Sequence, residues 1–410
     1  MHARPSAEHT RKAIFSRARW LAAFLVTFVT TSLAFVESAH AYTWMIRHGY
    51  GGCVPCHADP SGAGALTAYG RAQGDVLLRS RYGDSSEEAS PAAGFLWGAI
   101  NLPEQLRIGA DLRAAYLTSK LDRGALAQRT IIMRTDLYGD AKFGRLRLAG
   151  SIGYSREGAL DSAITRDTRD NLVSREHWIG YELDEDATWL VRAGRIALPF
   201  GIRNVEHTFW VRELTRTNLQ DDQQHGLALS FAKDWIRGEV MGIAGNLQLR
   251  PDDYRERGYS AFVEVAPSTH LAIGASSLFT RANRDIYLRV TNYRQAHGLF
   301  VRYAPVPSVV LLAEVDWVYQ SLTWHGHRSG FAGLLQADFE PTQGVHLMLA
   351  GEAKNDGAAD QPSSFGGWAS VAWFFGRHVD LRLDDIYQRL GSTTGGKDAF
   401  SLLLQIHAYL

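Results

Sequence analysis

Apolar and polar residues alternate along most of this chain, and this alternation limits the folds that it can adopt. Between residues 105 and 116 every second residue is apolar, and the same pattern returns at 145–154 and 401–410. A period of two places the apolar side chains on one face of a β-strand and the polar side chains on the other. Repeated segments of about ten such residues, separated by turns, are typical of a transmembrane β-barrel, with lipid outside and a polar lumen inside.

Sixteen segments follow this pattern between residue 105 and the C-terminus, and their connections alternate in length. Short periplasmic turns alternating with longer outer loops are what an outer-membrane barrel requires. The short turns are expected near Gly144, Asp186, Lys233, Ser268, Val306, Gln343 and Arg377. The predicted strands are 105–117, 128–141, 145–155, 175–185, 188–199, 225–232, 235–245, 257–266, 270–281, 293–304, 308–320, 328–340, 344–353, 365–375, 378–389 and 398–410. We therefore predict an all-β fold, a transmembrane antiparallel β-barrel of about 16 strands over 105–410.

The composition excludes several other classes of protein. The 410 residues include 43 basic and 43 acidic ones, whereas a nucleic-acid-binding protein would carry a basic surplus. A helical membrane protein with several spans needs several apolar runs of about 20 residues, and this chain has one, at 20–36. The tryptophans at or near the predicted strand ends are expected at the two membrane interfaces; they are Trp189, Trp210, Trp235, Trp317, Trp324, Trp368 and Trp373.

The first 41 residues have the layout of a secretory signal peptide. Basic residues precede the apolar run, and Ala39-His40-Ala41 after it fits an A-x-A cleavage signal. An uncleaved membrane anchor is the alternative, and the cleavage signal argues against it. The sequence predicts an exported chain that begins at Tyr42.

Cys53-Val54-Pro55-Cys56-His57 is a C-x-x-C-H motif, which is typical of c-type haem attachment. The two thiols add to the haem vinyl groups, and the adjacent imidazole becomes the proximal ligand of the iron. A zinc site would need further Cys or His ligands, and a redox C-x-x-C would need a thioredoxin-like context that is missing. The sequence therefore predicts one covalent haem c, bound by Cys53, Cys56 and His57.

The sixth ligand of the iron is left open by the sequence. Met45 and His48 lie just before the motif, and the amine of Tyr42, a residue of the barrel or no ligand at all are the other possibilities. The choice matters because methionine raises the reduction potential relative to a second histidine. The haem propionates have their own candidate partners, because arginine suits bidentate carboxylate recognition: Arg47, Arg71, Arg79 and Arg81.

The haem segment at 42–83 is too short to bury a haem within a core of its own. It is followed by a turn-rich linker at 84–104, so we expect it to pack against the barrel. A second unusual segment, 200–224, is long and highly charged. We expect it to fold partly into the lumen, because Phe209, Trp210 and Leu214 need cover from water.

An exported chain with one C-x-x-C-H motif ahead of a porin-like barrel resembles the fused monohaem cytochrome–porins of the bacterial outer membrane, the iron-oxidase type. The resemblance extends over the whole mature chain as architecture, and its specific residues are Cys53, Cys56 and His57. It implies electron transfer across or at the outer membrane through the haem, from extracellular ferrous iron or another redox substrate to a periplasmic electron-carrier cytochrome, with lipid around the barrel.

Two alternatives to electron transfer remain open. One is an outer-membrane porin for small solutes in which the haem segment is a plug or sensor; Gly194-Arg195 and Leu198-Pro199-Phe200-Gly201 also look like anion-type porins. The other is a secreted haem protein that does not enter a membrane. No arrangement of catalytic residues is recognisable, so catalysis beyond redox chemistry has no support in the sequence.

Overall fold

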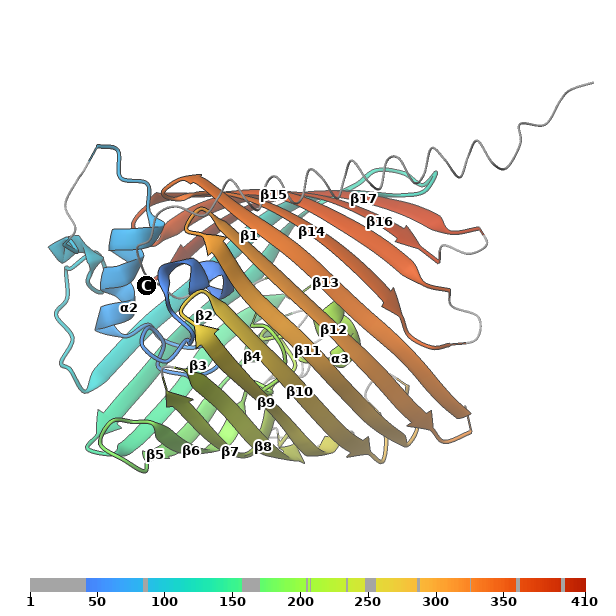
Figure 1. Ribbon diagram of the computed structural model, residues 1–410, viewed down its shortest axis with the longest axis horizontal. Coiled ribbons are helices and arrows are strands. Elements are labelled where there is room, and N and C mark those ends of the chain that lie inside the picture. The colour runs from blue at the N-terminus through green and yellow to red at the C-terminus, as the bar shows by residue number, and fades with distance from the viewer. Residues whose placement is uncertain are drawn as a thin grey trace, which may run out of the picture.

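The strands of this protein close into a single antiparallel barrel (Figure 1). The computed structural model describes residues 42–83, 88–156, 170–203, 206, 208–233, 235–247, 256–285, 288–324, 326–358, 362–391 and 395–410. The predicted signal peptide at 1–41 lies outside these residues. The first strand, β1 (Leu106–Leu121), pairs with both β2 (Ala127–Phe143) and β17 (Lys397–Tyr409), which closes the sheet.

The remaining strands follow one another around the barrel in chain order. They are β3 (Leu146–Arg156), β4 (Asp170–Val173), β5 (His177–Glu182), β6 (Trp189–Ile196), β7 (Gln224–Lys233), β8 (Ile236–Gly245), β9 (Glu256–Ser268), β10 (Leu271–Ala282), β11 (Asn292–Val306), β12 (Val309–Leu322), β13 (Gly326–Thr342), β14 (Val345–Asn355), β15 (Ser364–Gly376) and β16 (Val379–Leu390). Both β4 and β5 pair with β3. They are therefore two parts of one interrupted strand, and the barrel has the sixteen strands that the sequence predicted.

The interruption between β4 and β5 was not predicted, since a single strand was expected at 175–185. At the break, Arg175 makes two hydrogen bonds. Its backbone N–H donates to Ser151 Oγ (3.0 Å), and its side-chain Nε donates to Asp136 Oδ2 (2.6 Å). The three consecutive residues 174–176 are all buried, so the in–out alternation is lost there. Partners on β2 and β3 hold this bulge, and local sequence does not reveal them.

The short turns all lie at one end of the barrel, where β1 begins and β17 ends (Figure 1). Large apolar side chains face outward along the strands, among them Leu299, Leu335 and Leu349, each more than 60% exposed. Charged side chains such as Arg302, Glu314 and Asp338 are buried inside. This distribution, apolar outside and polar inside, is that of a transmembrane barrel.

Of the seven tryptophans, five face outward, as a position at a membrane interface requires, and two do not. Trp189, Trp235, Trp317, Trp324 and Trp373 are exposed on the barrel surface. Trp210 and Trp368 are instead buried in the lumen. There Trp368 packs edge-on against Phe209, with ring centroids 4.9 Å apart, because the segment carrying Phe209 and Trp210 folds inward and provides them with an apolar environment.

The helices of the described residues are short, and none is long and apolar enough to span a membrane. Four precede the barrel: η1 (Thr43–His48), α2 (Ala68–Gln73), η2 (Gly74–Leu78) and η3 (Pro91–Ala93). The Thr67 side chain caps α2 by accepting the Gly70 N–H at 2.9 Å. The fifth, α3 (Trp210–Thr215), follows β6 in the chain and lies inside the barrel, in contact with β12, β13 and β14 (Figure 1).

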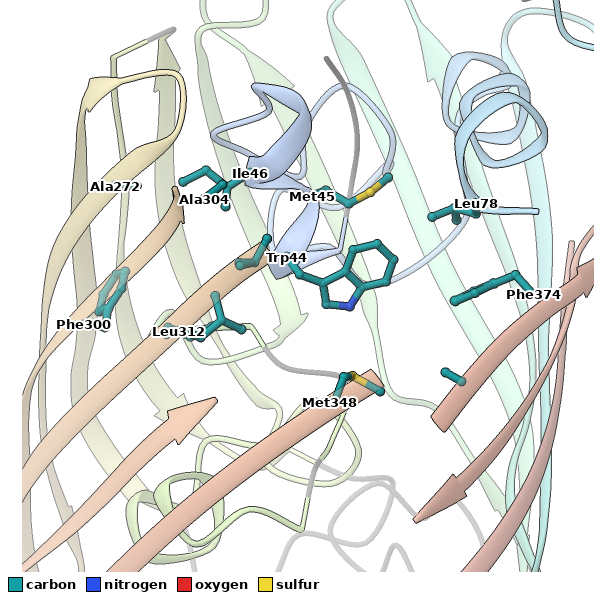
Figure 2. Packing of buried hydrophobic residues seen from close by; sticks show 13 residues of the cluster. Trp44, Met45, Ile46, Leu78, Ala272, Phe300, Ala304, Leu312, Met348 and Phe374 are labelled. Atoms are coloured by element: carbon teal, nitrogen blue, oxygen red, sulfur yellow. The ribbon is translucent and has the colours of Figure 1, made fainter. Parts of the chain in front are cut away.

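The segment η1 lies in the lumen and forms a core with the barrel wall. Trp44, Met45 and Ile46 are at most 7% exposed and pack with apolar residues of β10, β11, β12, β14 and β15 (Figure 2). Next to them, the buried Arg47 forms ion pairs with Asp338 and Glu340 of β13. The haem segment thus uses the barrel wall as the core that it is too short to build.

The segment between β6 and β7 also folds into the lumen, as expected from its apolar residues. Phe209 and Val211 pack with Ala332, Leu334 and Trp368 of the wall. Ion pairs hold the same segment in place: Arg212 with Glu314, Arg382 with Glu206, Arg216 with Asp285, and Lys354 with Glu213. The lumen therefore holds both the haem segment and this inward loop, whose described residues are 197–203, 206 and 208–223.

Candidate cofactor site

The C-x-x-C-H motif forms a helical turn that holds its three functional side chains close together. The backbone N–H groups of Cys56 and His57 both donate to the carbonyl oxygen of Cys53, at 3.1 and 3.0 Å. The next residue, Ala58, is fixed by Arg147 of β3, whose Nη2 donates to the Ala58 carbonyl at 2.6 Å. The turn is thus anchored to the barrel wall and is not a free loop.

A second contact fixes the same segment on the β6 side of the lumen. Asp59 is buried and forms an ion pair with Arg192 of β6 at 2.5 Å, and Arg192 also pairs with Glu239 of β8 at 2.6 Å. Arg192 lowers the pKa of Asp59 against the effect of burial, which alone would raise it. The carboxylate therefore stays charged and holds the motif at a defined position in the lumen.

The motif borders a hollow inside the barrel with a volume of about 190 Å³. Cys53, His57 and Met45 line this hollow, together with wall residues of β1, β2 and β17. Cys56 lies next to them and is 1% exposed. Residues that are far apart in the sequence, the C-x-x-C-H motif among them, thus line one partly open hollow in the lumen.

The surroundings of the motif's histidine fit a metal ligand. Nδ1 of His57 is buried and has no hydrogen-bond partner among the described residues. Burial lowers the pKa of His57 to about 4, because the imidazolium form would lose its hydration. The imidazole is therefore neutral at physiological pH, which is the form that binds a metal ion.

Two glycines allow the chain to pack tightly around the cysteines. Gly62 has a left-handed φ of +85°, and a Cβ there would lie 3.0 Å from the Cys53 Sγ. A Cβ on Gly70 would lie 2.3 Å from the Cys56 carbonyl oxygen, which is too close for any other residue. The cysteines, the neutral imidazole and this close packing all fit a haem c attached at Cys53 and Cys56.

Of the two candidates for the sixth ligand, one borders the hollow and the other does not. Met45 is 1% exposed and lines the hollow. His48 is not among the lining residues, and burial lowers its pKa to about 4. Tyr42 also lines the hollow, as do Met133 of β2 and His407 of β17. Sequence reasoning had no means of placing these last two, because only the closure of the barrel brings β2 and β17 to the motif.

The four arginines that the sequence suggested for the haem propionates are engaged with protein groups. Arg47 pairs with Asp338 and Glu340, and Arg79 pairs with Asp75 at 2.5 Å. Arg71 donates to the Ile108 carbonyl, and Arg81 to the Val76 carbonyl. None of the four is among the residues that line the hollow, so that prediction is wrong.

Comparison with known proteins supports the barrel fold and gives no information on a cofactor. No protein-family model and no curated protein matches the sequence. Among solved structures, the outer-membrane expressed OmpT of Vibrio cholerae is similar, with a TM-score of 0.56 and 11% identity over 76% of this chain and 100% of OmpT. An anion-selective porin from Comamonas acidovorans has a TM-score of 0.54 and 10% identity, over 74% of this chain and 99% of the porin.

A third similar structure is the outer-membrane channel DcaP of Acinetobacter baumannii. Its TM-score is 0.53 and its identity 11%, over 74% of this chain and 97% of DcaP. At such low identity the likeness concerns the fold alone. The chain has the sixteen-stranded barrel of these porins, and about a quarter of its residues lie outside the matched part.

Proposed function

We propose that this protein is an outer-membrane barrel that carries one covalent haem c in its lumen and transfers electrons across or at the membrane. One observation carries the proposal: Cys53, His57 and Met45 line the same hollow in the lumen, and Cys56 lies buried beside it. Two thiols, a neutral imidazole and a thioether are the groups that a c-type haem uses. The likeness to porins supports the location in an outer membrane.

In this proposal each residue of the site has a defined task. Cys53 and Cys56 would hold the haem through thioether bonds, and His57 and Met45 would ligate its iron. A bound haem would supply a centre that accepts and releases one electron. The aromatic and apolar residues around Met45 exclude water from the site, which together with a methionine ligand favours a raised potential.

The position of the hollow suggests the partners. C-terminal residues Tyr409 and Leu410 and residues of α2 border it, so it lies toward the short-turn end of the barrel, which is the periplasmic end in an outer-membrane barrel. A soluble periplasmic cytochrome is the acceptor that could approach this end. Extracellular ferrous iron, or another reductant of similar size, is the donor that we propose on the opposite side.

The test uses the full-length protein, purified in detergent. We expect a haem signal that stays with the polypeptide on a denaturing gel, and that signal should be absent from the double variant Cys53→Ala/Cys56→Ala. The oxidised protein should then take electrons from ferrous iron and pass them to a periplasmic cytochrome in stopped-flow measurements. A wild-type protein without covalent haem, or a haem that exchanges electrons with neither partner, would contradict the proposal.

A solute channel is the second candidate function, and the structural likeness to porins favours it. The haem segment would then be a plug or sensor, and small solutes would pass between it and the inward loop. Planar-bilayer recordings distinguish the two proposals. Substantial conductance that is equal in the wild type and the double cysteine variant, with no electron exchange, would favour the channel.

A further inference from the structure

Arginines in the lumen of this barrel are nearly always paired with carboxylates. Arg134 of β2 lines the hollow and contacts Asp111 and Asp136 at 3.0 and 2.9 Å. Arg237, next to Cys53, pairs with Glu264, and so does Arg302. This pairing is expected, because a buried charge without a partner is costly. An arginine that faces the hollow without a partner therefore requires an explanation.

Arg203, in the inward loop, is such a residue. It lines the hollow, and its Nε, Nη1 and Nη2 atoms are all buried without a hydrogen-bond partner among the described residues. Burial lowers its pKa to about 10, since nothing nearby compensates fully for the lost hydration of the guanidinium group. The described part of the chain uses none of the five N–H donors of this side chain, which borders the hollow.

Arg113 of β1 is a second arginine of this kind. It also lines the hollow, its Nε is buried without a hydrogen-bond partner, and it forms no ion pair with a carboxylate in the part of the chain that the structure describes. Two arginines from different elements, one in the inward loop and one in the barrel wall, thus border the same hollow with unused donors.

We propose that Arg203 and Arg113 are the receptor for carboxylate groups of the ligand in this hollow, which are the two propionates of the haem. Guanidinium groups bind carboxylates through two parallel hydrogen bonds, and a haem carries two such groups. The inference rests on the proposed haem function and extends it. It assigns to the inward loop a direct part in cofactor binding and connects this loop, through the haem, to the motif at Cys53.

The test measures the reduction potential of the haem-loaded full-length protein. Replacing Arg203 or Arg113 by Gln removes a positive charge that stabilises the reduced haem. We expect the midpoint potential to fall by at least the equivalent of a tenfold change in the reduction equilibrium, about 59 mV for one electron. Arg203→Lys keeps the charge and should retain most of the potential. Arg123→Gln, in the exposed turn after β1, should leave it unchanged.

Folding is checked in the same samples by the different gel migration of heated and unheated barrel. If Arg203→Gln does not fold, Arg113→Gln and Arg203→Lys still decide the question. Folded, fully haem-loaded Gln variants with the wild-type potential would overturn the inference while leaving the proposed function intact. A wild-type chain that holds no haem would overturn both, and the gel stain identifies that outcome.

The same carboxylate chemistry could serve a free anionic solute passing through the lumen. The double cysteine variant, which lacks haem, tests whether the arginines bind such a solute. Its ion selectivity is measured in planar bilayers with and without Arg203→Gln. An anion preference that disappears with Arg203→Gln, together with an unchanged potential in the haem-loaded variants, would overturn the assignment to propionates. A potential shift without any change in selectivity supports it.

Discussion

At the scale of single residues, Gly62 determines whether the chain can pack against Cys53. We expect Gly62→Ala to lower the yield of haem-attached protein several-fold, because the new Cβ would lie 3.0 Å from the Sγ that must react. Gly83→Ala is the matched control, since Gly83 has nearly the same φ, +88°, but an added Cβ there would meet nothing within 4 Å. Both variants carry the left-handed backbone cost of roughly 1–2 kcal/mol.

The haem stain per folded barrel on denaturing gels measures this yield. A reduction in Gly62→Ala alone shows that crowding at the thiol is responsible. An equal reduction in both variants would show that backbone strain explains the effect, and equal, full yields would show that the close approach is unimportant.

The axial ligand opposite His57 can be tested with a second pair of variants. We expect Met45→Leu to lower the midpoint potential and to remove the weak long-wavelength absorption of methionine-ligated oxidised haem, because methionine ligation raises the potential. His48→Leu should leave both unchanged, since His48 does not line the hollow. The opposite result would place His48 on the iron, and no change in either variant would point to Met133, His407 or the Tyr42 amine.

The sequence predicts Cys53, Cys56 and His57 as haem-attachment residues, and this assignment stays a prediction. These residues lie close together in the sequence, and their C-x-x-C-H spacing is typical of haem attachment. Nothing in the sequence indicates that Arg203 and Arg113 lie beside the same hollow. Arg203 and Arg113 cannot be told from other arginines by sequence, because the closed barrel decides which arginines meet a carboxylate. The error over Arg47 has the same origin, because Asp338 lies 291 residues away.

At the scale of elements, η1 is held in the lumen by Arg47. We expect Arg47→Leu to destabilise the docked haem segment by about 3–5 kcal/mol, because Asp338 and Glu340 would remain buried without their cation. Hydrogen exchange of residues 43–66 should then become much faster, while the strands keep their protection. Lys354→Ala is the control: its partner Glu213 is 58% exposed, and such pairs contribute at most about 1 kcal/mol. Unchanged exchange in Arg47→Leu would contradict this assignment.

The inward loop should respond to pH through Asp222. Burial raises the pKa of Asp222 to about 7, whereas in the unfolded chain it is near 4. Between these values the folded loop holds a proton that the unfolded chain has lost, so the docked loop loses stability as the pH rises from about 4 to about 7. The total is on the order of 4 kcal/mol, at 1.36 kcal/mol per pKa unit.

Hydrogen exchange of residues 208–223, corrected for intrinsic rates, measures this effect at pH 5 and pH 8. Wild-type protein should open more readily at pH 8. Asp222→Asn, which cannot ionise, should show a much smaller difference between the two pH values. An equal pH response in wild type and variant would show that another group is responsible.

Strands were predictable because their period of two is imposed by lipid on one side and the lumen on the other, residue by residue. This holds even for short strands such as β6 and β8. It failed between β4 and β5, where Arg175 turns inward to Asp136 and Glu176 lies against Gly64 of the haem segment. A bulge held by partners on other strands and on the haem segment has no local signal.

At the scale of the whole molecule, two segments fill the barrel lumen between them. The haem segment packs against β10–β15 through η1 and is bound to β3 through Ala58 and to β6 through Asp59. The inward loop binds β12, β14 and β16. A lumen occupied in this way argues against the passage of large solutes.

The outer surface provides the last test, because it separates a membrane barrel from a secreted one. Leu349 lies near the middle of β14 and is 64% exposed, so we expect Leu349→Arg to destabilise the protein in a lipid bilayer by about 2–4 kcal/mol, the cost of arginine near the midplane. In Trp324→Arg, at the 94% exposed turn after β12, the cost should be close to zero. Denaturant titrations of bilayer-inserted protein, read by gel mobility, measure both. Equal stability of Leu349→Arg and Trp324→Arg would mean that this face does not contact hydrocarbon, and the membrane assignment would fail.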